Sequence, residues 1–101
     1  MNACANEGTR RADDELNRIY KLLLIKVCDD ALAKGKIRAA QNAWIKYRDT
    51  YIEAMYPAKD KQVEYGSIYP MEVDLLGAKL TRQQTTALRE ILKQYQTEGH
   101  R

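Results

Sequence analysis

The stretch QNAWIKYRD at residues 41–49, taken with DDELNRIY at residues 13–20, decides the fold class of this chain. In each stretch the apolar residues recur at steps of three and four, which is the period of an α-helix with one buried face. Both stretches also carry polar groups within or beside that apolar face, where solubility alone would not place them. They therefore predict amphipathic helices whose buried faces include polar side chains.

The apolar period continues outward from these stretches and predicts an all-α fold, a small antiparallel bundle of three to four helices. No segment alternates with period two, so we expect no sheet. Helices are expected at about residues 9–34, 37–56, 67–79 and 82–96. The predicted core contains Leu16, Ile19, Leu23, Trp44, Tyr51, Leu76 and Leu88.

Glycine and proline mark the expected helix ends. Gly35 is placed to stop the first helix in a left-handed conformation, and Pro57 to close the second. A connection as short as the one at Gly35 makes the first two helices antiparallel neighbours. Thr81 and Gln84 have the form of a capping box, which leaves open whether the last two segments are one bent helix or two.

Composition limits the chain to a single ordered domain over residues 1–101. Hydrophobic residues make up 45% and charged residues 31%, which is ordinary for a globular protein. No apolar run approaches the roughly 20 residues of a membrane span, and no export signal opens the chain, so it is either cytoplasmic as written or a mature exported form. The net charge of +3 comes from interleaved charges without a basic block, so we expect no nucleic-acid partner.

Arg48 falls near the middle of the second helix's apolar face, beside Gln41. An arginine there needs acceptors or a path to water. With a turn near Gly35, Arg48 would lie level with Tyr20 and within reach of Asn17, whereas Asp13 would lie about 9 Å too far along. The expected partners of the guanidinium are therefore Asn17, Tyr20, Glu72 or Asp74.

Two interpretations of this polar group remain. It is either a ligand pocket around Arg48 and Asn17, or a structural polar network that fixes how the helices align, formed by Asn17, Tyr20, Gln41 and Arg48. We favour the structural network, because satisfied polar networks inside small bundles usually specify packing.

Residues for catalysis are nearly absent. The only histidine is His100, beside the C-terminus, and the only serine is Ser67. Neither position suggests a nucleophile held next to a base. No glycine-rich phosphate loop and no set of metal ligands is present. The sequence predicts a non-enzymatic protein without cofactor or metal.

The connection between the second and third predicted helices is the candidate binding segment. Tyrosine provides a large contact area at low entropic cost, and long loops in small domains are often functional. The predicted binding residues are Tyr56, Tyr65, Gly66, Ser67 and Tyr69. The alternative is that these rings only cap the end of the bundle.

Several motifs follow one another in an order that resembles a known family: Asn2-Ala3-Cys4-Ala5, Ala12-Asp13-x-x-Leu16-Asn17-x-x-Tyr20, Gln41-x-x-Trp44-x-x-x-Arg48-Asp49, Gly66-Ser67, Leu80-Thr81 and Arg89. The chain is similar to the secreted bacterial family typified by the N-terminal domain of the lysozyme-inhibitor lipoprotein LprI. The resemblance covers the chain from Asn2 to about Leu92. It implies an exported, periplasmic or secreted, all-α domain without enzymatic activity, with lysozyme inhibition in some members.

The cysteines depart from that family. Its members commonly carry two cysteines where this chain has Tyr51 and Leu76, so an aromatic–aliphatic contact is expected in place of a disulfide. Cys4 matches the family's first cysteine, and Cys28 has no counterpart. On one helix these two lie about 36 Å apart, against about 4.4–6.8 Å between the Cα atoms of a disulfide. They are therefore either free thiols or partners in an intermolecular bond.

Two functional hypotheses follow. The first is an exported binding module that presents the Tyr56–Tyr69 loop to a protein partner, such as a lysozyme or another cell-wall hydrolase. Animal-type lysozymes are strongly basic, so a chain of net charge +3 gains no overall attraction to them. The second is a structural or assembly protein of the cell envelope that acts as a homodimer, joined through Cys4 or Cys28.

Overall fold

Four helices form the fold. The computed structural model describes the backbone of residues 2–98 and the side chains of residues 10–96. The helices are α1 (Asn2–Lys26), α2 (Ala31–Met55), the short α3 (Lys61–Tyr65) and α4 (Tyr69–Glu98). No strand occurs among the described residues. The predicted all-α helical bundle is confirmed.

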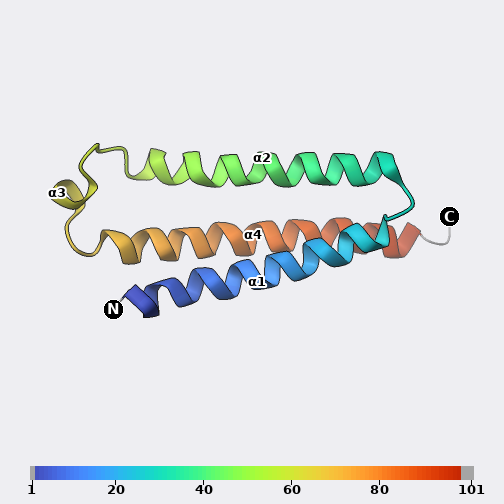
Figure 1. Cartoon of the computed structure of the whole chain (residues 1–101), viewed down its shortest axis with the longest axis horizontal. Coiled ribbons are helices and arrows are strands. Elements are labelled where there is room, and N and C mark those ends of the chain that lie inside the picture. Colours follow the sequence, from blue (N-terminus) through green and yellow to red (C-terminus); the bar gives the residue numbers. More distant parts are fainter. Residues whose placement is uncertain (1, 99–101) are drawn as a thin grey trace.

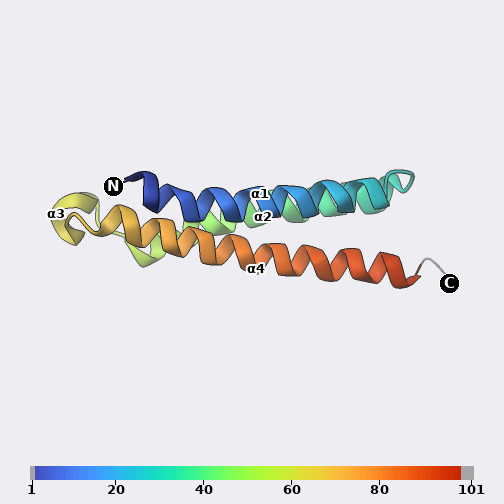
Figure 2. The ribbon, with the colours of Figure 1, turned by 90° about the horizontal axis from the view of Figure 1, so that it is seen from below.

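The three long helices run along one axis and make an elongated molecule of 56 × 24 × 16 Å. Helices α1 and α4 run in the same direction and lie side by side, while α2 runs antiparallel to both (Figure 1). Figure 2, from below, shows α4 alongside α1, with the two ribbons at a small angle to each other. The N-terminal end of α1 and helix α3 lie at one end, and the turn between α1 and α2 lies at the other.

The chain reverses between α1 and α2 at residues 27–30, earlier than predicted. Asp30 has extended backbone angles and its side chain accepts a hydrogen bond from the backbone nitrogen of Ala33 at 3.0 Å, which makes it the N-cap of α2. Gly35 is an exposed residue inside α2 and does not end a helix. The predicted bounds 9–34 and 37–56 were therefore wrong at this turn, because the aspartate cap outweighs the conformational freedom of the glycine.

Helix α4 is continuous, so the predicted segments 67–79 and 82–96 are one helix. Thr81 is not an N-cap, since it lies inside α4, where its side chain is fully buried. The amide of Gln84 points away from its own helix and donates to Gln41 Oε1 of α2 at 3.0 Å. Pro70 lies in the first turn, where a helix tolerates a residue without an N–H. The capping-box pattern here thus comes from two residues that face other helices.

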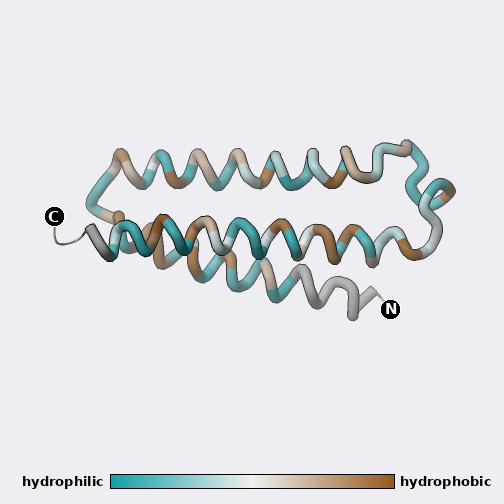
Figure 3. Tube along the Cα trace, turned by 180° about the vertical axis from the view of Figure 1, so that it is seen from behind, coloured by the Kyte–Doolittle hydropathy of each residue, from teal (hydrophilic) through white to brown (hydrophobic). Residues whose placement is uncertain are grey.

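The core lies between α1 and α4. Brown, apolar positions recur along both helices in Figure 3, as expected for two helices that share one buried seam. Small residues, among them Ala12 and Ala78, are buried in this seam together with larger apolar side chains. The central cluster of buried side chains comprises Leu16, Ile19, Leu23, Val27, Ile37 and Leu88.

Three residues predicted for the core are less buried than expected. Trp44 is half-buried and packs against the central cluster from α2. Tyr51 and Leu76 are also half-buried. Trp44 and Tyr51 belong to α2, which approaches the other helices at far fewer places than α1 approaches α4. The contact predicted between Tyr51 and Leu76 stays a prediction.

Candidate binding surface

Three tyrosines gather at the end of the bundle that carries α3. The rings of Tyr56 and Tyr65 meet edge to face with centroids 5.2 Å apart, and those of Tyr56 and Tyr69 do so at 5.3 Å. Tyr65 and Tyr69 stack at 5.6 Å. Each ring therefore contacts both others, in arrangements that aromatic pairs favour. We call this group the tyrosine cluster.

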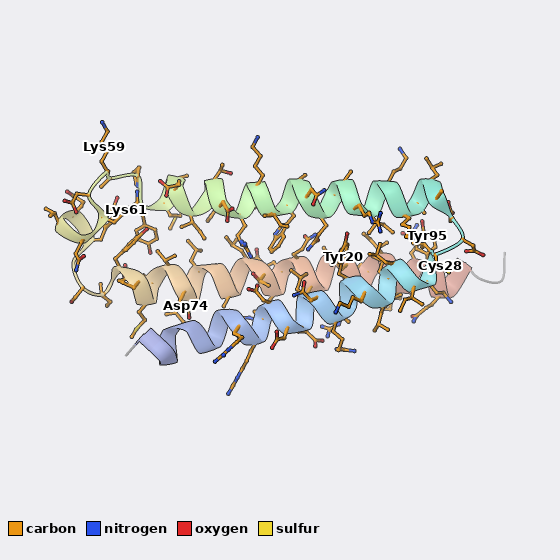
Figure 4. The ribbon with its side chains drawn as sticks, in the orientation of Figure 1. Tyr20, Cys28, Lys59, Lys61, Asp74 and Tyr95 are labelled. Carbon is orange, nitrogen blue, oxygen red and sulfur yellow. The ribbon has the colours of Figure 1, made fainter. Side chains whose placement is uncertain are left out.

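Hydrogen bonds fix the chain around the tyrosine cluster. The Tyr65 hydroxyl accepts from the backbone nitrogen of Ala58 at 3.0 Å. The ammonium of Lys61 donates to the carbonyl oxygen of Ala58 at 2.5 Å and to Glu53 at 3.2 Å. In Figure 4, Lys61 points back into this loop while Lys59 points away from the bundle. The loop is thus closed onto the end of α2.

Helix α3 has defined ends although it spans a single turn. The side chain of Asp60 accepts from the backbone nitrogen of Val63 at 3.2 Å and caps its start. Gly66 ends it with φ of +79°, a left-handed value that favours glycine, and donates to the carbonyl of Gln62 at 2.9 Å. The sequence predicts a loop at these residues, since five residues are too few to show a helical period.

The environment of Tyr56 is the most perturbed at this end. Burial raises the pKa of its hydroxyl above the ordinary value, and the nearby carboxylate of Glu72 raises it further, followed by Tyr69 and Tyr65. The phenol therefore stays neutral through the physiological range.

The five predicted binding residues divide into two groups. Tyr56, Tyr65 and Tyr69 are half-buried because they contact one another, as the alternative of a capped bundle end expected. Gly66 shapes the turn, and the exposed Ser67 is not held in the cluster by any of the contacts above. Because the three rings cover one another, the faces of the rings are not the main exposed surface at this end of the bundle.

The exposed apolar surface at this end comes from residues that sequence reasoning missed. Val63 on α3 is 79% exposed, and Ile68 and Met71 are 55% and 50% exposed. Large apolar side chains grouped on a surface often mark contact sites. No signal in the sequence marks their exposure: Ile68 and Met71 fall within the helix predicted over residues 67–79, and Val63 lies in the predicted loop. A shallow groove of about 270 Å³ lies beside them, lined by Lys61, Gln62, Gly66, Tyr69 and Pro70.

Arg48 lies in a second groove that adjoins this surface at Pro70. The groove has a volume of about 270 Å³ and is lined from α1, α2 and α4, with Asp74 of α4 on its wall. The Arg48 guanidinium forms ion pairs with Asp13 at 3.8 Å and Asp49 at 3.5 Å. Its Cζ also lies 5.0 Å from the centroid of the Trp44 ring, a cation–π distance.

This geometry corrects the predicted partners of Arg48. Asn17 is exposed on α1 and Tyr20 packs against the core cluster, whereas the guanidinium pairs with Asp13 and Asp49. Asp13, judged too distant from the sequence, is a partner instead. Because the chain reverses at 27–30, Arg48 lies nearer the N-terminus of α1 than a turn at Gly35 would place it.

Gln41 forms a separate polar contact. It is 6% exposed, and its side-chain oxygen accepts from Gln84 Nε2 of α4. The predicted network of Asn17, Tyr20, Gln41 and Arg48 is therefore two contacts, Gln41 with Gln84 and Arg48 with Asp13. Both join α2 to another helix, and Gln84 was missed because its spacing from Thr81 suggested a cap.

The described residues offer a surface without an evident reactive centre. No group of three His, Cys, Asp or Glu side chains within them is arranged to hold a metal ion. None of the helices, as far as the structure describes them, is long and apolar enough to span a membrane. Cys28 is an exposed free thiol. The side chain of Cys4 and residue His100 lie outside the described part.

Fold and surface together define a small all-α bundle with a cluster of aromatic rings at one end. Comparison with known sequences gives the family: the model of the lysozyme inhibitor LprI family matches residues 1–88, and the chain belongs to that family. It is 37% identical over 105 residues to the uncharacterized protein R02472 of Rhizobium meliloti (strain 1021), covering 92% of this chain and 72% of that protein. No solved structure matches the chain.

Proposed function

We propose that this protein is an exported, non-enzymatic binding module whose α3 end contacts a protein partner, with a lysozyme or another cell-wall hydrolase as the candidate. The observation that carries the proposal is the group of exposed apolar side chains at Val63, Ile68 and Met71 beside the tyrosine cluster. Family membership supports a protein partner of this kind.

The α3 end has the properties of a preformed contact surface. Edge-to-face rings, the Lys61 hydrogen bonds and the Gly66 turn hold the backbone beneath the exposed side chains. A surface ordered before binding loses less conformational entropy when a partner docks. Central apolar anchors of this type usually carry most of the binding free energy.

Local charge at this end differs from the charge of the whole chain. The groove that adjoins the surface is lined by three aspartates, Asp13, Asp49 and Asp74, with Arg48 among them. A basic partner that covers the α3 end would bring cationic side chains to this rim. Complementary charge of that kind raises the rate of association even where the net charges are alike in sign.

Titration of lysozyme activity with the purified chain tests the proposal. We expect inhibition that saturates near one equivalent, and the double variant Val63→Asp/Ile68→Asp should abolish it while the circular dichroism spectrum is kept. The matched control is Leu32→Asp, since Leu32 is 71% exposed and lies near the opposite end on α2. An equal loss of inhibition in the double variant and in the control would mean that the contact lies elsewhere. If one equivalent of the unaltered protein does not inhibit lysozyme, lysozyme is not the partner.

A homodimer in the cell envelope is the second candidate, and Cys28 is the observation that favours it. Its thiol is free and exposed at the α1–α2 turn, close in sequence to Ile25 and Leu32, which are 67% and 71% exposed. A disulfide between two copies at this turn would leave the α3 end accessible. A dimer that disappears on reduction, and in Cys28→Ser, would support this candidate, whereas a monomer under oxidising conditions would reject it.

A further inference from the structure

A groove of about 460 Å³ runs between α1 and α4, away from the α3 end. Its walls carry Arg11 and Glu15 from α1 and Arg82 and Arg89 from α4, and Thr85 and Thr86 lie between the last two. Arginines seven residues apart lie on one face of a helix, about 10.5 Å from each other along its axis. Arg82 and Arg89 therefore line the groove from positions two helical turns apart.

Positive charge is in excess along this groove. Glu15 is the one acidic residue that lines it among the described residues, against three arginines. Glu15 accepts hydrogen bonds from Arg18 at 3.0 and 2.8 Å and forms an ion pair with Arg89 across the helix pair. One carboxylate thus balances part of the charge of two arginines, and the Arg82 end of the groove stays electropositive.

The threonines shape the groove without adding donors. Thr85 donates to the carbonyl of Thr81 at 3.0 Å, and Thr86 donates to the carbonyl of Arg82 at 3.2 Å. Their hydroxyl hydrogens are thereby used within α4. The other donors that line the groove are guanidinium N–H groups, which suit the planar or tetrahedral oxygens of carboxylate and phosphate.

We propose that the α1–α4 groove binds a small multivalent oxyanion, a molecule that carries two or more phosphate or carboxylate groups, between Arg82 and Arg89. The site shares no residue with the α3 end, so it stands or falls independently of the proposed protein partner. Its ligand would bridge two arginines of α4 at the side that faces α1, and it would compete with Glu15 of α1 for Arg89.

Isothermal titration calorimetry with pyrophosphate and with citrate, each at ionic strength matched with sodium chloride, tests this site. We expect saturable one-to-one binding of at least one probe, and the stronger probe distinguishes phosphate from carboxylate chemistry. Arg82→Gln should weaken binding by about tenfold or more, as expected for loss of a charge-assisted contact. The matched control Arg38→Gln removes an exposed arginine of α2 outside the groove and should leave binding unchanged.

Glu15→Gln provides a test of opposite sign. Removal of the competing carboxylate frees Arg18 and Arg89, so affinity for the anion should rise, whereas general damage to the groove would lower it. Circular dichroism checks that each variant is folded. Absence of binding beyond the chloride background for both probes, or equal weakening by Arg38→Gln and Arg82→Gln, would overturn the proposal.

Discussion

Helices α1 and α2 contact α4 in different ways, although the sequence makes both amphipathic. Helix α1 packs along α4 through a mainly apolar seam, in which Leu23 and Leu88 are 0% and 1% exposed. Helix α2 contributes two buried residues, Ile37 and Gln41, and otherwise reaches the core through the half-buried Ala33 and Trp44. One interface is therefore apolar and extensive, and the other consists of a few separate contacts.

The difference shows what each kind of contact is suited to do. Apolar burial scales with the area removed from water, so the α1–α4 seam supplies most of the stability. Polar contacts such as Gln41 with Gln84 contribute less but depend on alignment, because a shift of α2 would leave buried amides unpaired. We infer that α1 and α4 form the stable part of the bundle and that the polar contacts set the position of α2.

Leu23→Ala should have the largest effect, because it empties a fully buried position of the seam. We expect the free energy of unfolding to fall by about 3–5 kcal/mol, the range for leucine to alanine in well-packed cores. Chemical denaturation followed by circular dichroism measures it. The neighbouring Leu22, 42% exposed, supplies the control, and Leu22→Ala should cost less than about 1 kcal/mol. Similar losses in both variants would contradict the assigned seam.

Trp44→Ala should cost less than the change at Leu23, about 2–3 kcal/mol, although tryptophan is far larger. The ring is only half-buried, and one side of it faces the Arg48 guanidinium rather than the core. The same denaturation experiment measures the loss. Ile45→Ala, at a residue 40% exposed on the same helix, is the control. A loss at Trp44 greater than at Leu23 would mean that α2 is as firmly packed as α1.

Tryptophan fluorescence gives a direct view of α2 in the unaltered protein, because Trp44 is the only tryptophan. If α2 is the less stable part, the fluorescence midpoint should fall at lower denaturant than the midpoint by circular dichroism. Coincident midpoints would instead show that the three long helices unfold as one unit.

Gln41→Leu should lower the free energy of unfolding by about 1–3 kcal/mol, since the Gln84 amide loses its acceptor within the bundle. The double variant Gln41→Leu/Gln84→Leu removes both partners and should recover most of the loss. Thermal unfolding of the two variants measures the difference. If the double variant is no more stable than the single one, the amide pair does not position α2.

The sequence was sufficient for the fold class because the apolar period of α1, α2 and α4 is strong over many turns. It was insufficient for the turn, where two signals competed within a few residues. Asp30 with Ala33 fits an N-cap as well as Gly35 fits a helix end, and only the packing of Val27 and Ile37 into one core selects between them. The partner of Arg48 depended on that choice, so one misplaced turn also changed the predicted site.

The candidate surface was harder to predict for a different reason. Tyr56, Tyr65 and Tyr69 were identified as a group from composition, but whether rings face solvent or each other is decided by the turn at Gly66 and by α3. Neither feature has a period that a sequence can show. Val63 and Ile68 were therefore missed as exposed residues, although they are 79% and 55% exposed.

Acidification should produce the smallest effect, at the rim of the α1–α4 seam. The pKa of Glu15 is lowered chiefly by its hydrogen bond from Arg18; burial opposes this, and the charges of Arg18 and Arg89 add to the lowering. A carboxyl group with a lower pKa in the folded than in the unfolded chain stabilises the fold at pH above its ordinary pKa. That contribution is lost as the pH falls through the lowered folded value.

The stability difference between the unaltered protein and Glu15→Gln should therefore be small near neutral pH and should vanish in acid, because the group is exposed and its ion pairs are screened. Thermal unfolding from neutral to strongly acidic pH measures it, with Glu90→Gln as the control for a charge lost elsewhere on α4. A difference that grows as the pH falls would show that Glu15 opposes the α1–α4 contact. A large difference in stability at neutral pH would mean that the α1–α4 seam depends on this ion pair as well as on its apolar interior. The seam would then resemble the polar contacts of α2 more than the burial of Leu23 and Leu88 implies.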